Sequence, residues 1–328
     1  MSDLKQATLA VGTVPYTAAN TENIVPVATF SHAKVNRNSL PKLDLNTELE
    51  TKSFLITAGD KYVYDHRYRM TAEQPEINEK LSIKVAEGAV GEMILNYEDD
   101  GQDSYLRYSE IEIDAEPSSH LTIFLVQRLG EHSHSRCKIK VNCQELSEVR
   151  MIIADSGAAT HGLDLQSDMQ ERSTFDCQGI YFGRNQERYD YNYNLIHHGI
   201  LCQSNLLVNG ALKDYAKKVF RGTIDFRRGS SGSSGSESEY VTMLDDTVSN
   251  IAIPLLLCTE DNVEGNHAAS AGRLDPNMVF YVMSRGFSRH EANKLIIASR
   301  FTNVLDLLPN SELKDAVLGD ILSKLDEA

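Results

Sequence analysis

The sequence contains no tryptophan, no long hydrophobic run and few basic residues for its 328 positions. Its 32 Lys and Arg residues stand against 47 Asp and Glu residues, which gives a formal net charge of −15 at pH 7. Because phosphate-binding surfaces concentrate Lys and Arg, this balance excludes nucleic-acid binding as the main function. The few basic pairs, such as Lys217-Lys218, are expected on a solvated strand face. Hydrophobic residues still make up 41% of the chain, which excludes wholesale disorder.

Cysteines are few and widely spaced, at Cys137, Cys143, Cys177, Cys202 and Cys258. A disulfide framework needs an even and dense set in a small secreted chain, and this odd set of five does not provide one. The segment Met1–Gly12 lacks the basic and apolar regions of a secretory signal peptide. No apolar stretch reaches the ~18 residues that a membrane-spanning helix needs. We therefore expect a reduced, cytoplasmic protein with no membrane span.

Motifs of nucleotide binding and nucleophilic catalysis are also missing. The run Gly229–Ser236 is rich in glycine but lacks the Lys-Ser/Thr that ends a phosphate-binding loop, so this chain is not expected to bind a nucleotide. There is no Gly-x-Ser-x-Gly elbow, and no spacing singles out the paired carboxylates of a glycosidase. The chain is therefore not expected to be an enzyme. The glycine run itself fits either a flexible linker or a tight turn between strands.

From about residue 81 onward, short runs alternate apolar and polar side chains, as in Leu81–Val85, Ile111–Asp114 and Cys137–Cys143. A period of two indicates strands with one buried face. Cys137 and Cys143 fall on the apolar side of their run and are expected in the core. Because Gly, Asn, Asp and Ser interrupt the runs where a βαβ sheet would need helices, the pattern favours an all-β sandwich, barrel or β-helix.

The C-terminal part carries helix signals instead. Asp275 followed by Pro276 is typical of an N-cap and first helical residue, and Gly286 is suited to the left-handed position after a helix end. Ser288 and Glu291 form a capping box that begins a second helix. A last helix, from about residue 312 to 325, places one apolar stripe at helical spacing: Leu313, Val317, Ile321 and Leu325.

These sequence patterns divide the chain into three parts. Residues 1–80 are expected to form a mixed, irregular region with some strand. Residues 81–256 are expected to form the β-rich core, and residues 257–328 a small helical domain. Just after the core, the run from Cys258 to His267 concentrates thiol, carboxyl and imidazole groups, including Glu264. His267 and Cys258 are candidate ligands for iron or zinc, although the run also fits an acidic surface loop.

Four blocks in this order resemble the SufB/SufD family of iron–sulfur cluster assembly proteins. They are Val219–Phe226, Tyr240–Pro254, Glu260–Asp275 and Val279–Ser288, and the likeness extends over roughly residues 185 to 310. The resemblance implies a right-handed parallel β-helix core followed by a C-terminal helical domain. In such a core, the glycine run would be an ordered turn.

The resemblance also implies partners. Members of this family form a complex with a SufC-like ABC ATPase, docked mainly through the helical domain, and with themselves or a second SufB/SufD-type chain. Transferred to this sequence, the candidate ATPase contacts are Phe280, Tyr281, Arg285 and Phe287. Phe280 and Phe287 suit helix packing equally well.

The family's functional residues match this sequence unevenly. The histidine that contributes to cluster building at the subunit interface is present as His267, so a transient iron–sulfur cluster at that interface is the implied cargo. Family cysteines are replaced by Val248 and Gly265. Cys258 and Glu264 are therefore the remaining interface candidates. These departures make the chain resemble a SufD-like or divergent stand-alone member.

The function expected from the sequence is thus a scaffold or partner subunit of a SUF-type assembly complex. Two alternatives stay open at this stage. One is a β-helix carbohydrate-active enzyme, which would share the strands and the acidic surface. The other is a structural interaction protein that has lost cluster chemistry, which the missing cysteines favour.

Overall fold

The computed structural model describes residues 40, 43–58 and 62–326, and two parallel sheets dominate them. The odd-numbered strands form one 8-stranded sheet, called here the odd sheet: β1 (Glu50–Ile56), β3 (Glu76–Val85), β5 (Leu106–Ala115), β7 (His134–Cys143), β9 (Thr160–Met169), β11 (Arg188–His197), β13 (Lys217–Phe226) and β15 (Ser249–Cys258). The even-numbered strands form a second 8-stranded sheet, the even sheet: β2 (Tyr62–Met70), β4 (Val90–Asp99), β6 (His120–Leu129), β8 (Glu148–Gly157), β10 (Thr174–Gly183), β12 (Gln203–Leu212), β14 (Ser234–Met243) and β16 (Glu264–Gly272).

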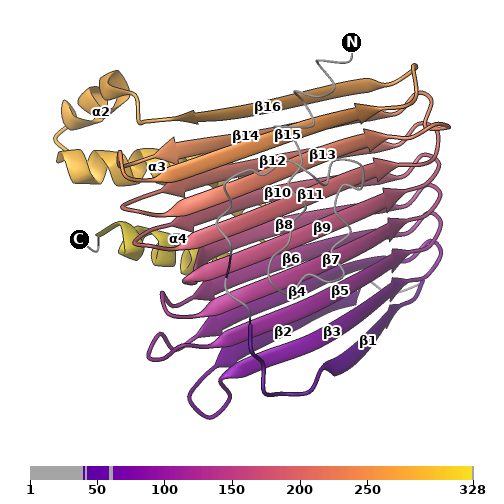
Figure 1. The fold of residues 1–328 in the computed structure, drawn as a ribbon, viewed down its shortest axis with the longest axis horizontal. Coiled ribbons are helices and arrows are strands. Elements are labelled where there is room, and N and C mark those ends of the chain that lie inside the picture. Colours follow the sequence, from indigo (N-terminus) through magenta and orange to yellow (C-terminus); the bar gives the residue numbers. More distant parts are fainter. Residues whose placement is uncertain (1–39, 41–42, 59–61, 327–328) are drawn as a thin grey trace.

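The two sheets are the walls of a parallel β-helix. Each coil contributes one strand to the odd sheet and one to the even sheet, and every strand pairs in parallel with the equivalent strand of the next coil. In Figure 1 the coils stack from β1 and β2 at the bottom to β15 and β16 at the top. The expected fold class, a parallel β-helix core with C-terminal helices, is confirmed.

Alternation along each strand explains why the coils stack. Leu81 pairs with Ile111, Ile111 with Ile139, and Ile139 with Leu165, so identical positions of successive coils form one buried column. All four are at most 1% exposed. The predicted strands at 81–85, 111–114 and 137–143 are confirmed, and the thiols of the last run are buried as predicted. Each coil buries its apolar face only against its neighbours, which makes the stack one cooperative body.

The glycine run is an ordered turn between coils. Gly229 and Gly232 have positive φ angles of 100° and 75°, which side chains with a Cβ rarely adopt. The run then enters β14 at Ser234. Of the two interpretations that the composition allowed, the tight turn is therefore the observed one.

Three helices follow the strands: α2 (Pro276–Met283), α3 (Arg289–Leu305) and α4 (Ser311–Asp326). The predicted caps are present, because Asp275 accepts a hydrogen bond from the backbone of Asn277 and Ser288 forms a complete capping box with Glu291. Gly286 has a φ of 99°, as expected for the residue after a helix end. The predicted stripe of the last helix is buried: Leu313, Val317, Ile321 and Leu325.

Helices α3 and α4 cover the outer face of the even sheet. Phe301 and Ile321 belong to one buried cluster with outward-facing residues of the even strands, among them Phe124, Ile152 and Ile180. Helix α2 lies outside this cluster and packs on α3 through Val279. The helical part is thus attached to the side of the β-helix, with α2 projecting beyond it (Figure 1).

The observed elements run across the expected boundaries. Strands β15 and β16 continue the β-helix to Gly272, beyond residue 257, and the helices begin only at Pro276. Within the expected irregular region 1–80, β1 and β2 already form the first coil, while residues 1–39 lie outside the described part. None of the helices in the described part of the chain has the length and the apolar composition of a membrane-spanning segment.

Candidate functional site

The last coil of the β-helix is open. Strand β15 pairs only with β13, and β16 only with β14, so among the described residues no strand covers their outer edges. Residues of β15 are half-buried and most of β16 is exposed. An uncovered strand edge presents unpaired N–H and C=O groups to which another chain can add a strand.

His267 lies at this open end. It pairs in register with Glu237 of β14. Because side chains alternate along a strand, His267 shares the inward face with Gly265, whose Cβ position would lie 2.8 Å from Leu256 of the facing strand. His267 is nevertheless exposed, since no coil of the described part of the chain lies above it. An inward-facing imidazole at an uncovered end is accessible to a partner chain.

Beneath His267 the interior of the β-helix is charged. Glu237, Glu239 and Lys218 are at most 1% exposed. Lys218 is ion-paired with Glu239, whose Oε1 also accepts a hydrogen bond from the Tyr181 hydroxyl at 3.1 Å. The expectation that the basic pair at 217–218 lies on a solvated face is wrong for Lys218. Its place in the alternation turns it inward, and a buried carboxylate provides the counter-charge that makes this position tolerable.

Burial changes the protonation of this cluster. It raises the pKa of Glu237 to about 8, and the neighbouring Glu239 adds to the effect. Burial also lowers the pKa of Lys218 to about 8, with the attraction of Glu239 acting in the opposite direction. Both oxygens of Glu237 lack a hydrogen-bond partner within the described structure. A neutral Glu237 is the form that such a site accommodates at neutral pH.

The two positions at which the family resemblance implies a cysteine, Val248 and Gly265, have different surroundings. Val248 lies in the turn before β15 and packs against the core cluster. At Gly265, an added Cβ would lie 2.8 Å from Leu256 and 3.0 Å from Phe226, so the space for a side chain is already filled. The last coil is therefore packed closely around Gly265.

The candidates Cys258, Glu264 and His267 do not converge. Glu264 and His267 face opposite sides of β16 because they are three positions apart on a strand. Cys258 is exposed at the end of β15, and burial together with Asp225 raises the pKa of its thiol. Within residues 43–58 and 62–326, no group of three or more His, Cys, Asp or Glu side chains is placed to hold a metal ion. Whether a metal or cluster visits His267 or Cys258 stays a prediction.

The four expected partner contacts lie on one part of the helical unit. Phe280 is 72% exposed and Tyr281 58%, and Phe287 is 42% exposed. Arg285 lies over the ring of Tyr281 at 5.1 Å and donates a hydrogen bond to its hydroxyl at 3.0 Å. Phe280 and Phe287 are therefore exposed on the surface and are not part of the packing between the helices. Apolar groups exposed in this way are unusual on a surface with no partner.

A groove between α3 and α4 continues this surface. It has a volume of about 310 Å³ and is lined by Phe287, His290, Lys294, Leu295 and Leu322, among others. Leu295 is 46% exposed. The exposed aromatics of α2 and the residues of this groove, which has Phe287 in its lining, are together called here the docking surface.

Sequence reasoning missed the charged cluster under His267. The sequence contained a sign of this cluster. Glu237, Glu239 and Val241 are alternate residues of one strand, so the two carboxyl groups face the same side as the buried Val241. What the sequence did not reveal was the facing strand that supplies Lys218. That contact depends on the register between the two sheets.

Comparisons with known proteins agree with this architecture. A family model described as "SUF system FeS cluster assembly, SufBD core domain" matches residues 68–300. The iron–sulfur cluster assembly protein SufD of Bacillus subtilis is 32% identical over 150 residues, which cover 46% of this chain and 34% of that protein. SufD of Escherichia coli is 26% identical over 155 residues, covering 47% and 37%. A SufBD family protein of Synechocystis is 28% identical over 172 residues, covering 51% and 37%.

The matched parts therefore span little more than a third of these relatives' length. The family model, in contrast, extends over most of the β-helix and into the helical unit. Its match includes the open end with His267 and the exposed aromatics of α2. This chain belongs to the SufBD core-domain family of the SUF system for iron–sulfur cluster assembly.

Proposed function

We propose that this chain is a scaffold subunit of a SUF-type iron–sulfur cluster assembly complex in the cytoplasm. It docks a SufC-like ABC ATPase through its helices and pairs at its open end with itself or with a second SufB/SufD-type chain. A transient iron–sulfur cluster is the cargo handled at the paired ends. The chain contributes position and interface groups rather than bond-making chemistry.

The observation that carries the ATPase proposal is the docking surface. Phe280, Tyr281 and Phe287 are exposed although α2 is firmly attached to α3 through the buried Val279, Ala292 and Ile296. A rigid helix with exposed aromatic side chains is the usual form of an interface anchor. Helix α2 also projects beyond the sheet, so a large partner reaches it without contacting the coils (Figure 1).

The open end carries the pairing proposal. The edges of β15 and β16 allow strand addition by a second chain, and His267 lies on the inward side of that edge. A partner's end would enclose the imidazole and remove it from water. A thiolate or carboxylate missing at 248 and 265 would then come from the partner, which makes pairing with a second, cysteine-bearing chain the favoured arrangement.

Anaerobic cluster reconstitution on the full complex tests this proposal. His267→Ala should lower the yield of cluster and leave thermal unfolding unchanged, because the side chain is exposed. The matched control is His120→Ala, a half-exposed histidine on β6 that faces Glu148. Equal yields from both variants would contradict the proposal, as would a loss of cooperative unfolding in His267→Ala alone.

A further inference from the structure

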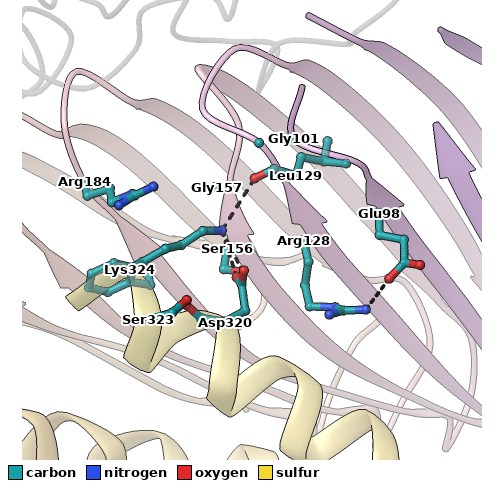
Figure 2. A network of polar contacts seen from close by, with 12 residues as sticks. Glu98, Gly101, Arg128, Leu129, Ser156, Gly157, Arg184, Asp320, Ser323 and Lys324 are labelled. Atoms are coloured by element: carbon teal, nitrogen blue, oxygen red, sulfur yellow. Dashed lines mark hydrogen bonds and ion pairs between the residues drawn. The ribbon is translucent and has the colours of Figure 1, made fainter. Parts of the chain in front are cut away.

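The contact between α4 and the even sheet is mostly apolar. The buried cluster joins Val317, Ile321 and Leu325 to outward-facing residues of the even strands. Apolar contacts are non-directional, so by themselves they permit a helix to slide or rotate on a sheet. Lys324 is an exception within this interface, since it is a charged residue that is only 7% exposed (Figure 2).

Lys324 joins α4 to two neighbouring coils. Its Nζ donates to Asp320 Oδ2 at 2.8 Å on the same helix, to the carbonyl oxygen of Leu129 at 3.5 Å and to Ser156 Oγ at 3.5 Å. Ser156 Oγ in turn donates to Asp320. Leu129 ends β6, and Ser156 lies next to the end of β8. One ammonium group therefore holds a helix and two strand ends together (Figure 2).

The backbone beneath the ammonium is shaped for this contact. Gly157 has a φ of 86°, and an added Cβ would lie 1.9 Å from the carbonyl oxygen of Leu129 and 2.8 Å from Lys324 Nζ. Only glycine leaves this space open. A second carboxyl group, Glu187 in the turn after β10, lies close by, and burial raises its pKa to about 7 while the positive charge of Lys324 acts in the opposite direction. The position of Lys324 is thus fixed on several sides.

The other charged contacts of α4 differ in kind. Lys314 pairs with Asp306, and Glu312 with Arg67 of β2, and these side chains are between 36% and 73% exposed. Asp326 pairs with His290 and Lys294 of α3, and it is itself 51% exposed. Exposed ion pairs are screened by water and fix a geometry weakly. A buried and fully hydrogen-bonded charge is costly to move, and it therefore favours one arrangement over its shifted neighbours.

We propose that Lys324 is a positioning residue that locks α4 in one place on the β-helix and so transmits motion of the docking surface to the ends of β6 and β8. This proposal rests on the proposed ATPase docking. A pull on α2 and α3 would then displace the 157–159 turn instead of sliding the helices over the apolar face. An apolar residue at 324 would keep the helix attached but not in register.

Hydrogen exchange on the full-length free protein tests the lock without any partner. Lys324→Met should accelerate hydrogen exchange of the α4 amides and of the 157–159 turn by about tenfold or more. This factor corresponds to the loss of one hydrogen bond to a charged group from the opening equilibrium. Lys314→Met, the matched control on the same helix, should change the same exchange rates less than about fivefold. Asp320→Asn, which keeps the shape and removes the acceptor charge, should resemble Lys324→Met and serves if that variant does not fold. Equal effects of the 324 and 314 substitutions would overturn the proposal.

The second arm adds the SufC-like ATPase. In the wild type, ATPase docking should change exchange at the 157–159 turn, whereas Lys324→Met should bind the ATPase with unchanged affinity and lose this change. A turn that still responds in Lys324→Met would overturn the proposal. If the wild type does not bind the ATPase, the proposed function is wrong, and the free-protein arm still decides whether Lys324 locks α4.

Discussion

Substitution of Glu237 tests whether the charged interior under His267 has the protonation that its burial requires. The carboxyl is 1% exposed, and its pKa of about 8 exceeds the 4.5 of an ordinary Glu. The unfolded chain therefore releases this proton first as pH rises, so a rising pH favours the unfolded state. The stability that the neutral carboxyl allows is fully present below pH 4.5 and is lost as pH rises toward 8.

The expected change in stability follows from the two pKa values, about 8 in the folded protein and 4.5 in the unfolded chain. Each pKa unit corresponds to about 1.4 kcal/mol, so between pH 5 and pH 8 the ionisation of Glu237 should cost about 3 kcal/mol of unfolding free energy. Glu237→Gln mimics the neutral acid at every pH and should remove this dependence. The two proteins should be similarly stable at pH 5, and the variant should be more stable at pH 8.

Urea unfolding of both proteins at pH 5, 6, 7 and 8 measures this difference directly. Groups outside this cluster that titrate in the same range, such as Glu187 with a pKa raised to about 7, cancel because both proteins contain them. Glu264→Gln on the exposed start of β16 is the matched control and should follow the wild type. Parallel curves for wild type and Glu237→Gln would refute a buried neutral carboxyl at this position.

Two further predictions concern backbone positions. Gly222→Ala should destabilise the protein by about 1–3 kcal/mol, because the new Cβ would lie 2.0 Å from Glu237 Oε1. Adding Glu237→Ala to this variant should restore most of the lost stability in urea unfolding. A double variant that is as unstable as Gly222→Ala alone would contradict the contact. Ser288→Ala should remove the capping box and lower the stability of α3 by about 1 kcal/mol. Hydrogen exchange in the first turn of α3 should then be faster. Unchanged exchange in that turn would show that the cap is not needed.

Much of this fold could be predicted from local patterns. Period-two alternation located strands such as β7, and the Ser288 box located the start of α3, because both signals depend only on neighbouring residues. The parallel stacking of coils came from the family resemblance. Some strand was expected within the region 1–80, but the positions of β1 and β2 were not located. Their alternation is weak at the first coil, where one side of the strand pair has no neighbouring coil among the described residues.

The candidate site was only partly predictable for a related reason. The importance of His267 was read from its sequence block, but its inward direction depends on its register with Glu237. Lys218 and Lys324 are both charged residues that sequence patterns place in water, yet both are buried beside a carboxylate from another element or turn. The Lys218–Glu239 pair and the burial of Lys324 against the even sheet both depend on tertiary packing, so no local periodicity reports them.

The central claim is that this chain docks a SufC-like ATPase through its helical unit. Binding of the purified full-length chain to that ATPase, measured by titration calorimetry for wild type and for Phe280→Ala combined with Tyr281→Ala, tests it most directly. The control is Tyr64→Ala, an aromatic residue 41% exposed on β2 at the opposite end of the β-helix. The 280/281 variant should bind at least about tenfold more weakly than the wild type, and the control should bind like the wild type. Absence of wild-type binding at micromolar concentrations, or equal affinities for all three proteins, would contradict it.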